Sequence, residues 1–464
     1  MAGLTSLLYT ARDALTAQSY GLDVTGQNIA NANTPGYVRR QVVLQTQAFG
    51  NQTTGTVQVG PLQRPTDVFL DDRRYESTGL SSSAGEEDNQ LANVQSLFND
   101  TTGGGISTSL DALFSSFSAL SASPNDSTTR QTVLSNAANF ASQLNDTANS
   151  IAQQKTDIMT EAKGVTVQVN QDATDIAKLN QQIATATAAG QDAADLKDQL
   201  GTKVQDLSTF INVHTFTDNQ GNLVVQGGGT TLVQGDVAST LSVGLATDGT
   251  MQFTAASQGG SSTDITAYVT GGKLAGLKQA RDTDLTQVGQ ELDQFAYDVA
   301  TAVNTQHASG AGLDGVSGRN LFSIGASATD AARTIAVDPS VAGQPNNIAA
   351  ASSSASLPGG SDNAVALAAL ANQSFASGGT RTASEAYSDV LGDVAQRKAS
   401  SANAVTLRGD VDAQVKTMQQ SQSGVSLDEE MVNLTSYQRA YEAATKVLTT
   451  ADTLLGELMN SVTT

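Results

Sequence analysis

The chain has 464 residues and a formal net charge of -21, from 24 basic and 45 acidic residues. No basic cluster is longer than a pair such as Arg39-Arg40 or Arg73-Arg74. Binding to phosphates requires larger groups of Lys and Arg, so we expect neither nucleic acid nor a membrane surface as a partner. Aromatic residues make up 5% of the chain, which favours slender helical packing over one large core.

The first predicted element is a helix from about Leu4 to Ala30. Its apolar residues recur every three or four positions, and this narrow stripe suits a coiled-coil seam. The helix is expected to end before Thr34-Pro35-Gly36, because proline removes a backbone donor and disfavours helical geometry in the preceding residue. The stripe consists of Leu4, Leu8, Ala11, Leu15, Leu22 and Ile29.

The next part of the chain is predicted to be a helical rod. Residues 41–70 are expected to be extended, and helical patterns begin at about residue 84. Breaks are predicted at Gly103–Gly105 and at Ser123–Asp126. A turn near Ala188–Asp192 then separates a long helix from a second arm. Together these elements predict a long helical hairpin.

A small antiparallel β insert is predicted over residues 209–272, where short alternating runs are separated by Asp-Gly and Gly-rich turns. A helix resumes near Gly276. Residues 309–361 are rich in Gly, Ser and Ala and carry no clear packing signal. Two further helical stretches follow, near 362–376 and 382–422.

The last predicted helix opens at Ser426. Ser426 with Glu429 three positions later predicts a capping box, and the acidic residues of the first turn suit the positive end of the helix dipole. Its apolar stripe runs for about four heptads, as expected for a coiled coil. The stripe consists of Leu434, Tyr437, Tyr441, Ala444, Leu448, Ala451, Leu455, Leu458 and Val462.

The predicted fold is mainly α (α+β) and elongated, with the first and last helices paired as an antiparallel coiled coil. This nested order predicts that both termini lie at one end and the β insert at the other. The predicted parts are an inner coiled coil of 1–41 and 424–464, an α-rich rod domain of 42–208, 273–308 and 362–423, a β-rich outer insert of 209–272, and a segment of undetermined packing at 309–361.

The segment Gln27–Tyr37 resembles a signature shared by bacterial flagellar rod, hook and hook-associated proteins. Residues 423–444 are similar to the C-terminal signature of the hook-associated members, and residues 271–282 are similar to the segment that follows their β domain. The matching residues of the first motif are Asn28, Asn31, Asn33, Thr34, Pro35, Gly36 and Tyr37.

The chain departs from the family pattern in two places. Arg40 stands where a Gln is common, which we interpret as a minor difference. Larger members carry an extra outer domain after a Phe-Phe segment that corresponds to residues 320–325. Here only about 40 residues separate that point from the next predicted helix. We therefore predict a reduced architecture, without a third compact domain within residues 322–362.

The resemblance implies a structural adaptor of the flagellum that joins hook to filament, lies outside the cell and is exported without a cleavable signal peptide. The implied partners are further copies of the chain, the hook protein, a second junction protein and an export chaperone. The terminal helices are expected to become ordered on assembly. The expected assembly and chaperone surface is Leu4, Leu8, Leu15, Leu22, Ile29, Leu434, Tyr437, Tyr441, Leu448, Leu455 and Leu458.

Two alternatives stay open. The chain could be a hook or distal rod protein, although the match at residues 424–430 argues against this. It could also be a secreted adhesin or enzyme that acts through the β insert. An enzyme is disfavoured because His214 and His307, the only histidines, are 93 residues apart. The sequence also lacks a nucleophile elbow, a zinc signature and a phosphate loop, so no catalytic, metal or cofactor site is expected.

Overall fold

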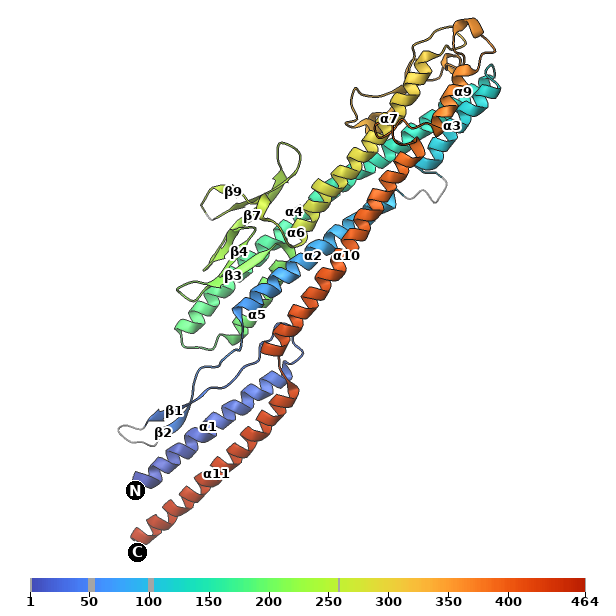
Figure 1. The fold of residues 1–464 in the computed structure, drawn as a ribbon. Helices are drawn as coiled ribbons and strands as arrows, with labels where there is room; N and C mark the ends of the chain where they lie inside the picture. The colour runs from blue at the N-terminus through green and yellow to red at the C-terminus, as the bar shows by residue number, and fades with distance from the viewer. Residues whose placement is uncertain (1, 49–54, 99–103, 258, 464) are drawn as a thin grey trace.

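The computed structural model describes all residues except 1, 49–54, 99–103, 258 and 464. The molecule is elongated, and both chain termini lie at the same end (Figure 1). At this end α1 (Ala2–Ala30) and α11 (Leu427–Thr463) run antiparallel and pack against each other. The fold is mainly helical with small antiparallel sheets, which confirms the predicted class.

A β-hairpin follows α1. It consists of β1 (Leu44–Ala48) and β2 (Gly55–Val59), paired antiparallel with Leu44 opposite Val59. β2 packs against α1. The extended chain predicted for residues 41–70 therefore covers part of the first helix.

The rod is built from long helices. They are α2 (Val68–Leu97), α3 (Ile106–Ala122), α4 (Ser127–Ala188), α5 (Ala194–Phe210), α7 (Leu285–Ser309) and α10 (Ala383–Ser423). The most extensive packing between two helices joins α2 and α10. Across the described residues, we find no helix with the length and apolar character needed to cross a lipid bilayer.

Helix α2 begins earlier than predicted, at Val68 rather than near residue 84. Asp67 caps it, because its carboxylate accepts hydrogen bonds from the backbone N–H groups of Phe69 and Leu70. After the first turn, residues 71–83 contain only Tyr75 and Leu80 as large apolar residues, so periodicity alone missed this part of the helix. The break predicted at Gly103–Gly105 falls between α2 and α3, and Gly103 lies outside the described residues.

The β insert lies beside the middle of the rod and not at the far end, so its predicted position was wrong (Figure 1). Asn170 and Asn180 of α4 hold it there, through hydrogen bonds to the backbone of Leu241 and Leu223. Its two sheets have the strand orders β3-β4-β5-β6 and β7-β8-β9. The strands are β3 (Val213–Thr217), β4 (Leu223–Gly227), β5 (Thr230–Gln234), β6 (Val237–Ala238), β7 (Thr240–Leu245), β8 (Met251–Ala256) and β9 (Ser262–Asp264).

A π-helical turn also connects the insert to the rod. The turn, Gln279–Asp284, separates α6 (Lys273–Lys278) from α7. The Asp282 carboxylate accepts a hydrogen bond from the backbone N–H of Met251 at 2.8 Å. Arg281 donates to the carbonyl of Gly249 at 3.0 Å. The inserted residue of such a turn redirects neighbouring side chains, here towards the insert.

The far end of the molecule is formed by residues 310–361 (Figure 1). They contain β10 (Phe322–Ser323), α8 (Ala331–Thr334) and β11 (Ala336–Val337), and α9 (Asp362–Ala369) follows them. Phe322 is fully buried, and its ring lies 6.1 Å from that of Phe140 in α4. Residues 322–362, all of which are described, therefore share the rod core and form no third compact domain.

Candidate assembly interface and its joint with the rod

Two contacts define how α1 and α11 face each other. A side chain added at Gly21 would place its Cβ 2.7 Å from the Tyr437 ring. The Asn28 amide donates a hydrogen bond to the Glu430 carboxylate at 3.1 Å. Gly21 and Asn28 are seven residues apart on α1, and Tyr437 and Glu430 are seven residues apart on α11. This spacing is the heptad repeat of an antiparallel coiled coil. The buried residues of α1 are mostly small or polar: Ala11, Ala17, Gly21, Thr25 and Asn28, together with Val24.

The leucine stripe predicted as the α1 seam does not face α11. Leu8, Leu15, Leu22 and Ile29 each follow a seam position by one residue, which turns them by about 100° around the helix. They are half-buried, as is Leu4. The prediction of the seam was wrong because periodicity shows that an apolar stripe exists, but not which neighbour covers it. The small residues let the two helices approach closely.

On α11 the predicted stripe does lie at or beside the seam. Ala444 and Ala451 are buried. By contrast, 41% of Tyr441 and 39% of Leu458 is exposed. Leu458 is seven residues beyond Ala451 on α11. In this register its position lies past the start of α1, so no α1 residue is opposite it. Half-buried members of the stripe are Leu434, Tyr437, Leu448 and Leu455.

Many large apolar side chains of the two helices remain exposed. They are distributed along both helices, and some lie on the end of α11 that extends past α1. Groups of large apolar side chains exposed to solvent are typical of surfaces that a protein partner covers. The residues are Leu7, Tyr9, Leu427, Met431, Val432, Tyr441, Val447, Leu454, Leu458 and Met459.

Asn28 of the predicted motif is the centre of a buried polar cluster. Its side-chain oxygen accepts hydrogen bonds from the Tyr37 hydroxyl at 2.8 Å and from the backbone N–H of Arg40 at 3.0 Å. Its amide donates to the Arg40 carbonyl at 2.9 Å and to Glu430. A buried Asn whose bonding capacity is filled in this way fixes the register of a coiled coil.

The rest of the motif builds the turn that ends α1. Asn31 donates to the Gln27 carbonyl at 3.0 Å and accepts from the Thr34 hydroxyl at 3.1 Å. Gly36 has a φ of +78°, and a Cβ at this position would clash with the Thr202 hydroxyl of α5. Only glycine suits both the backbone and the space. The remaining motif residues, Asn33 and Pro35, are exposed.

Arg40 is not the minor difference that the sequence suggested. It is 5% exposed and forms ion pairs with Asp195 and Asp198 at the start of α5. Its guanidinium carbon lies 5.0 Å from the centre of the Tyr37 ring. Burial acts to lower the pKa of Arg40, but the hydrogen bonds to Asp195 and Asp198 and the nearby negative charge together outweigh this effect, and the pKa is raised. Pairing between such distant residues leaves no local signal in the sequence.

Arg39 connects the same segment to α11. Its guanidinium donates to Glu429 at 2.5 Å and to Glu430 at 2.8 Å. The Ser426 hydroxyl lies 3.5 Å from the backbone N–H of Glu429, which is long for a cap. The Glu429 carboxylate, which a capping box would direct back to the backbone of Ser426, thus pairs with Arg39.

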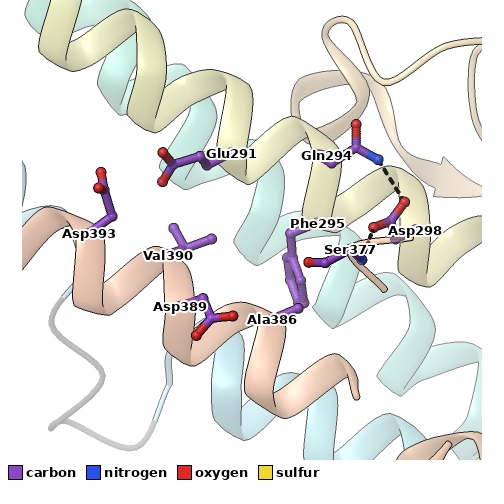
Figure 2. A pocket seen from close by; sticks show the side chains of 9 residues that line it. All are labelled: Glu291, Gln294, Phe295, Asp298, Ser377, Ala386, Asp389, Val390 and Asp393. Atoms are coloured by element: carbon purple, nitrogen blue, oxygen red, sulfur yellow. Dashed lines mark hydrogen bonds between the residues drawn. The ribbon is translucent and has the colours of Figure 1, made fainter. Parts of the chain in front are cut away.

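Another group of carboxylates lies in the rod. A cavity of about 310 Å³ between α7 and α10 is lined by Glu291, Asp298, Asp389 and Asp393, with Phe295 at its base (Figure 2). Asp389 and Asp393 are paired with arginines, and Asp298 accepts a hydrogen bond from a backbone N–H at 2.9 Å. No group of three potential metal ligands occurs in the described part of the chain.

The histidines have separate surroundings. His214 is largely exposed on β3, where its ring lies 3.1 Å from the Asp72 carboxylate. His307 is fully buried in α7, and Nδ1 donates to the Arg319 carbonyl at 2.7 Å while Nε2 accepts from the backbone N–H of Ala349 at 3.0 Å. The structure therefore gives His307 a place in the packing of residues 310–361.

Comparison with known proteins places the two terminal helices in a class. A model of the flagella basal body rod protein matches residues 8–37, and one of the flagellar basal body rod FlgEFG protein C-terminal region matches residues 418–461. The paired helices thus define a protein of the flagellar rod and hook class. A third model, the flagellar hook-associated protein FlgK helical domain, matches residues 91–322, half of the chain. The chain belongs to the FlgK family of flagellar hook-associated proteins.

Full-length relatives agree with this assignment. Flagellar hook-associated protein 1 of Bacillus subtilis is 27% identical, over 98% of both chains. That of Salmonella typhimurium is 27% identical over 98% of this chain and 100% of its own. This second comparison extends over 556 residues, so that relative has residues that this chain lacks.

A solved structure shows the same fold. It is described as that of the flagellar hook junction protein FlgK from Burkholderia pseudomallei. The TM-score is 0.68 at 17% sequence identity, and the match covers 76% of this chain and 100% of the other.

Proposed function

We propose that the protein is a structural adaptor that joins the flagellar hook to the filament by assembling through its terminal helices. The observation that carries this proposal is the row of exposed apolar side chains along α1 and α11, at the end of the molecule where both termini lie. Membership of the FlgK family supports it, since that family is structural and belongs to the flagellum.

The physical reason is incomplete burial. The helix pair buries Ala444 and Ala451, but leaves Tyr441, Leu454 and Leu458 exposed by 41%, 44% and 39%. Covering apolar surface stabilises a complex by about 25 cal/mol per Å². Identical copies arranged head to tail would cover each other's rows and extend into a ring or helical tier. The terminal helices would become fully ordered only in that assembly.

The proposed partners follow from this surface. Further copies of the chain cover it within a tier, the hook protein contacts the tier on one side, and a second junction protein contacts it on the other. Before assembly an export chaperone would cover α11. The protein would then act outside the cell, exported without a cleavable signal peptide.

The test is a chain that ends at Ser423. It lacks α11, so we expect the rod to stay folded, with an unchanged thermal transition, while assembly on isolated hooks is lost. A finer variant replaces Tyr441, Leu454 and Leu458 with Ser, all three at exposed positions of α11. This variant should fold as the wild type does and assemble poorly.

A matched control replaces Gln438 and Thr453, exposed polar residues on the same helix, with Ser. The control should assemble normally, because it leaves the apolar row unchanged. Polymerisation of the chain that ends at Ser423 on hooks would refute the proposal.

A further inference from the structure

The terminal helix pair and the rod meet through a narrow joint. α1 packs mainly against α11 and β2, and the chain passes between the helix pair and the rod at residues 31–43, 60–67 and 424–426. Beside the crossing at 424–426, the backbone N–H of Arg39 donates to the Ser423 carbonyl at 2.9 Å. Among the described residues, neither α1 nor α11 packs extensively against a helix of the rod, so polar contacts at the joint can fix the angle between the two bodies.

Arg39 and Arg40 supply those contacts in opposite directions. Successive residues of an extended chain place their side chains on opposite sides. Arg39 accordingly points to Glu429 and Glu430 of α11. Arg40 points to Asp195 and Asp198 of α5, within the rod.

The contacts of Arg40 reach three parts of the molecule. Its guanidinium donates to the Gln27 side chain at the end of α1 at 3.3 Å and lies over the Tyr37 ring. Arg64, which follows the β-hairpin, also pairs with Asp198. A buried charge that loses its partners is strongly unfavourable, so this arrangement resists rotation of the helix pair away from α5.

We infer that Arg39 and Arg40 form a clamp that sets the angle of the terminal helix pair relative to the rod, with Arg40 as the positioning residue. This inference rests on the proposed function, because the angle decides how the apolar rows of neighbouring copies meet. A released clamp leaves both bodies folded but lets the helix pair take many orientations.

Spin-label distances test the clamp in the full-length monomer. The chain has no cysteine, so Cys introduced at the exposed positions Ala184 of α4 and Ala443 of α11 would carry the only two labels. The wild-type distance distribution should be narrow. In Arg40→Gln it should become roughly twice as wide, because several orientations become populated. Asp195→Asn combined with Asp198→Asn should have the same effect from the rod side.

Three controls separate release of the clamp from unfolding. Labels at Ser19 of α1 and Ala443 should keep a narrow distribution in every variant, which shows that the helix pair persists. Arg12→Gln removes an exposed arginine of α1 that pairs with its neighbour Asp13, and should change nothing. Arg40→Lys should restore part of the narrow distribution, since it keeps the charge without the planar geometry.

An unchanged distribution between Ala184 and Ala443 in Arg40→Gln would overturn the inference. Broadening between Ser19 and Ala443 would do so as well, because it would mean that Arg40 holds the helix pair together. Neither result bears on the Ser423 truncation, which tests assembly itself, so failure of the clamp and failure of the proposed function are distinguishable.

Discussion

At the scale of single residues, buried polar side chains connect parts of this chain that are far apart in sequence. Asn28 and Glu430 join the two terminal helices, although 402 positions separate them. At the far end of the molecule, His307 joins α7 to Arg319 and Ala349. A buried donor or acceptor without a partner costs about 1–3 kcal/mol, so such residues stabilise one arrangement against others.

The surroundings of His307 predict a pH dependence. Burial lowers its pKa below the usual value, and both ring nitrogens are used in the neutral form. The unfolded chain therefore binds the proton more readily, with a pKa of about 6.5. The stabilising contribution of His307 is complete above that pH and is lost as pH falls towards the folded-state pKa.

His307→Gln provides the test, because Gln can donate and accept hydrogen bonds without becoming charged. The free energy of unfolding of each protein is measured by urea titration between about pH 8 and pH 5. The free energy of unfolding of the wild type should exceed that of the variant at high pH, and this difference should shrink as the pH falls. A constant difference would contradict the prediction. Carboxylates with a raised pKa, such as Asp284, occur in both proteins and cancel in the comparison.

At the scale of elements, α1 is a helix with two different contacts. Its small residues face α11, whereas β2 packs elsewhere on the helix. Close approach at Gly21 brings the Tyr437 ring over the helix backbone. The same helix contains Gly26, which has no atom within 4 Å of an added Cβ. These two glycines therefore separate the effect of packing from that of helix propensity.

Gly21→Ala should destabilise the helix pair by about 1–3 kcal/mol, because the new methyl group displaces the Tyr437 ring. Gly26→Ala should stabilise it by about 0.5–1 kcal/mol, because alanine loses less conformational entropy in a helix. Amide hydrogen exchange of residues 434–451 measures both effects. Equal changes of the same sign would show that α11 does not pack at Gly21.

At the scale of the whole molecule, the terminal helices, the β insert and residues 310–361 occupy different positions along the long axis. The terminal helices occupy one end, residues 310–361 the other, and the β insert lies beside the middle of the rod (Figure 1). An adaptor that assembles through its terminal helices leaves the outer surface of the insert free. A secreted adhesin would instead depend on that surface.

Phe216→Ser combined with Leu245→Ser distinguishes these two functions. Both side chains belong to the insert and are about half exposed, at 47% and 54%. We expect swimming motility to match wild type, and the free energy of unfolding to change by less than about 0.5 kcal/mol for each substitution. Loss of binding to a surface with assembly intact would favour the adhesin.

The sequence by itself determined the elements and the class of protein. Local signals carry this information: the apolar periodicity of α1 and α11, the proline after Thr34, and the short alternating runs of the insert. The motif from Asn28 to Tyr37 indicated the flagellar class, and the short segment after Phe322 indicated the missing outer domain. Each of these signals lies within a few dozen consecutive residues.

Only the tertiary structure decided which surfaces meet. It turned Gly21 rather than Leu22 towards α11, placed the β insert beside α4, and paired Arg40 with Asp195 and Asp198. These outcomes depend on close approach between distant segments and on the burial of charge, which neither periodicity nor composition records. The surface left exposed by that packing is the one on which the proposed assembly depends.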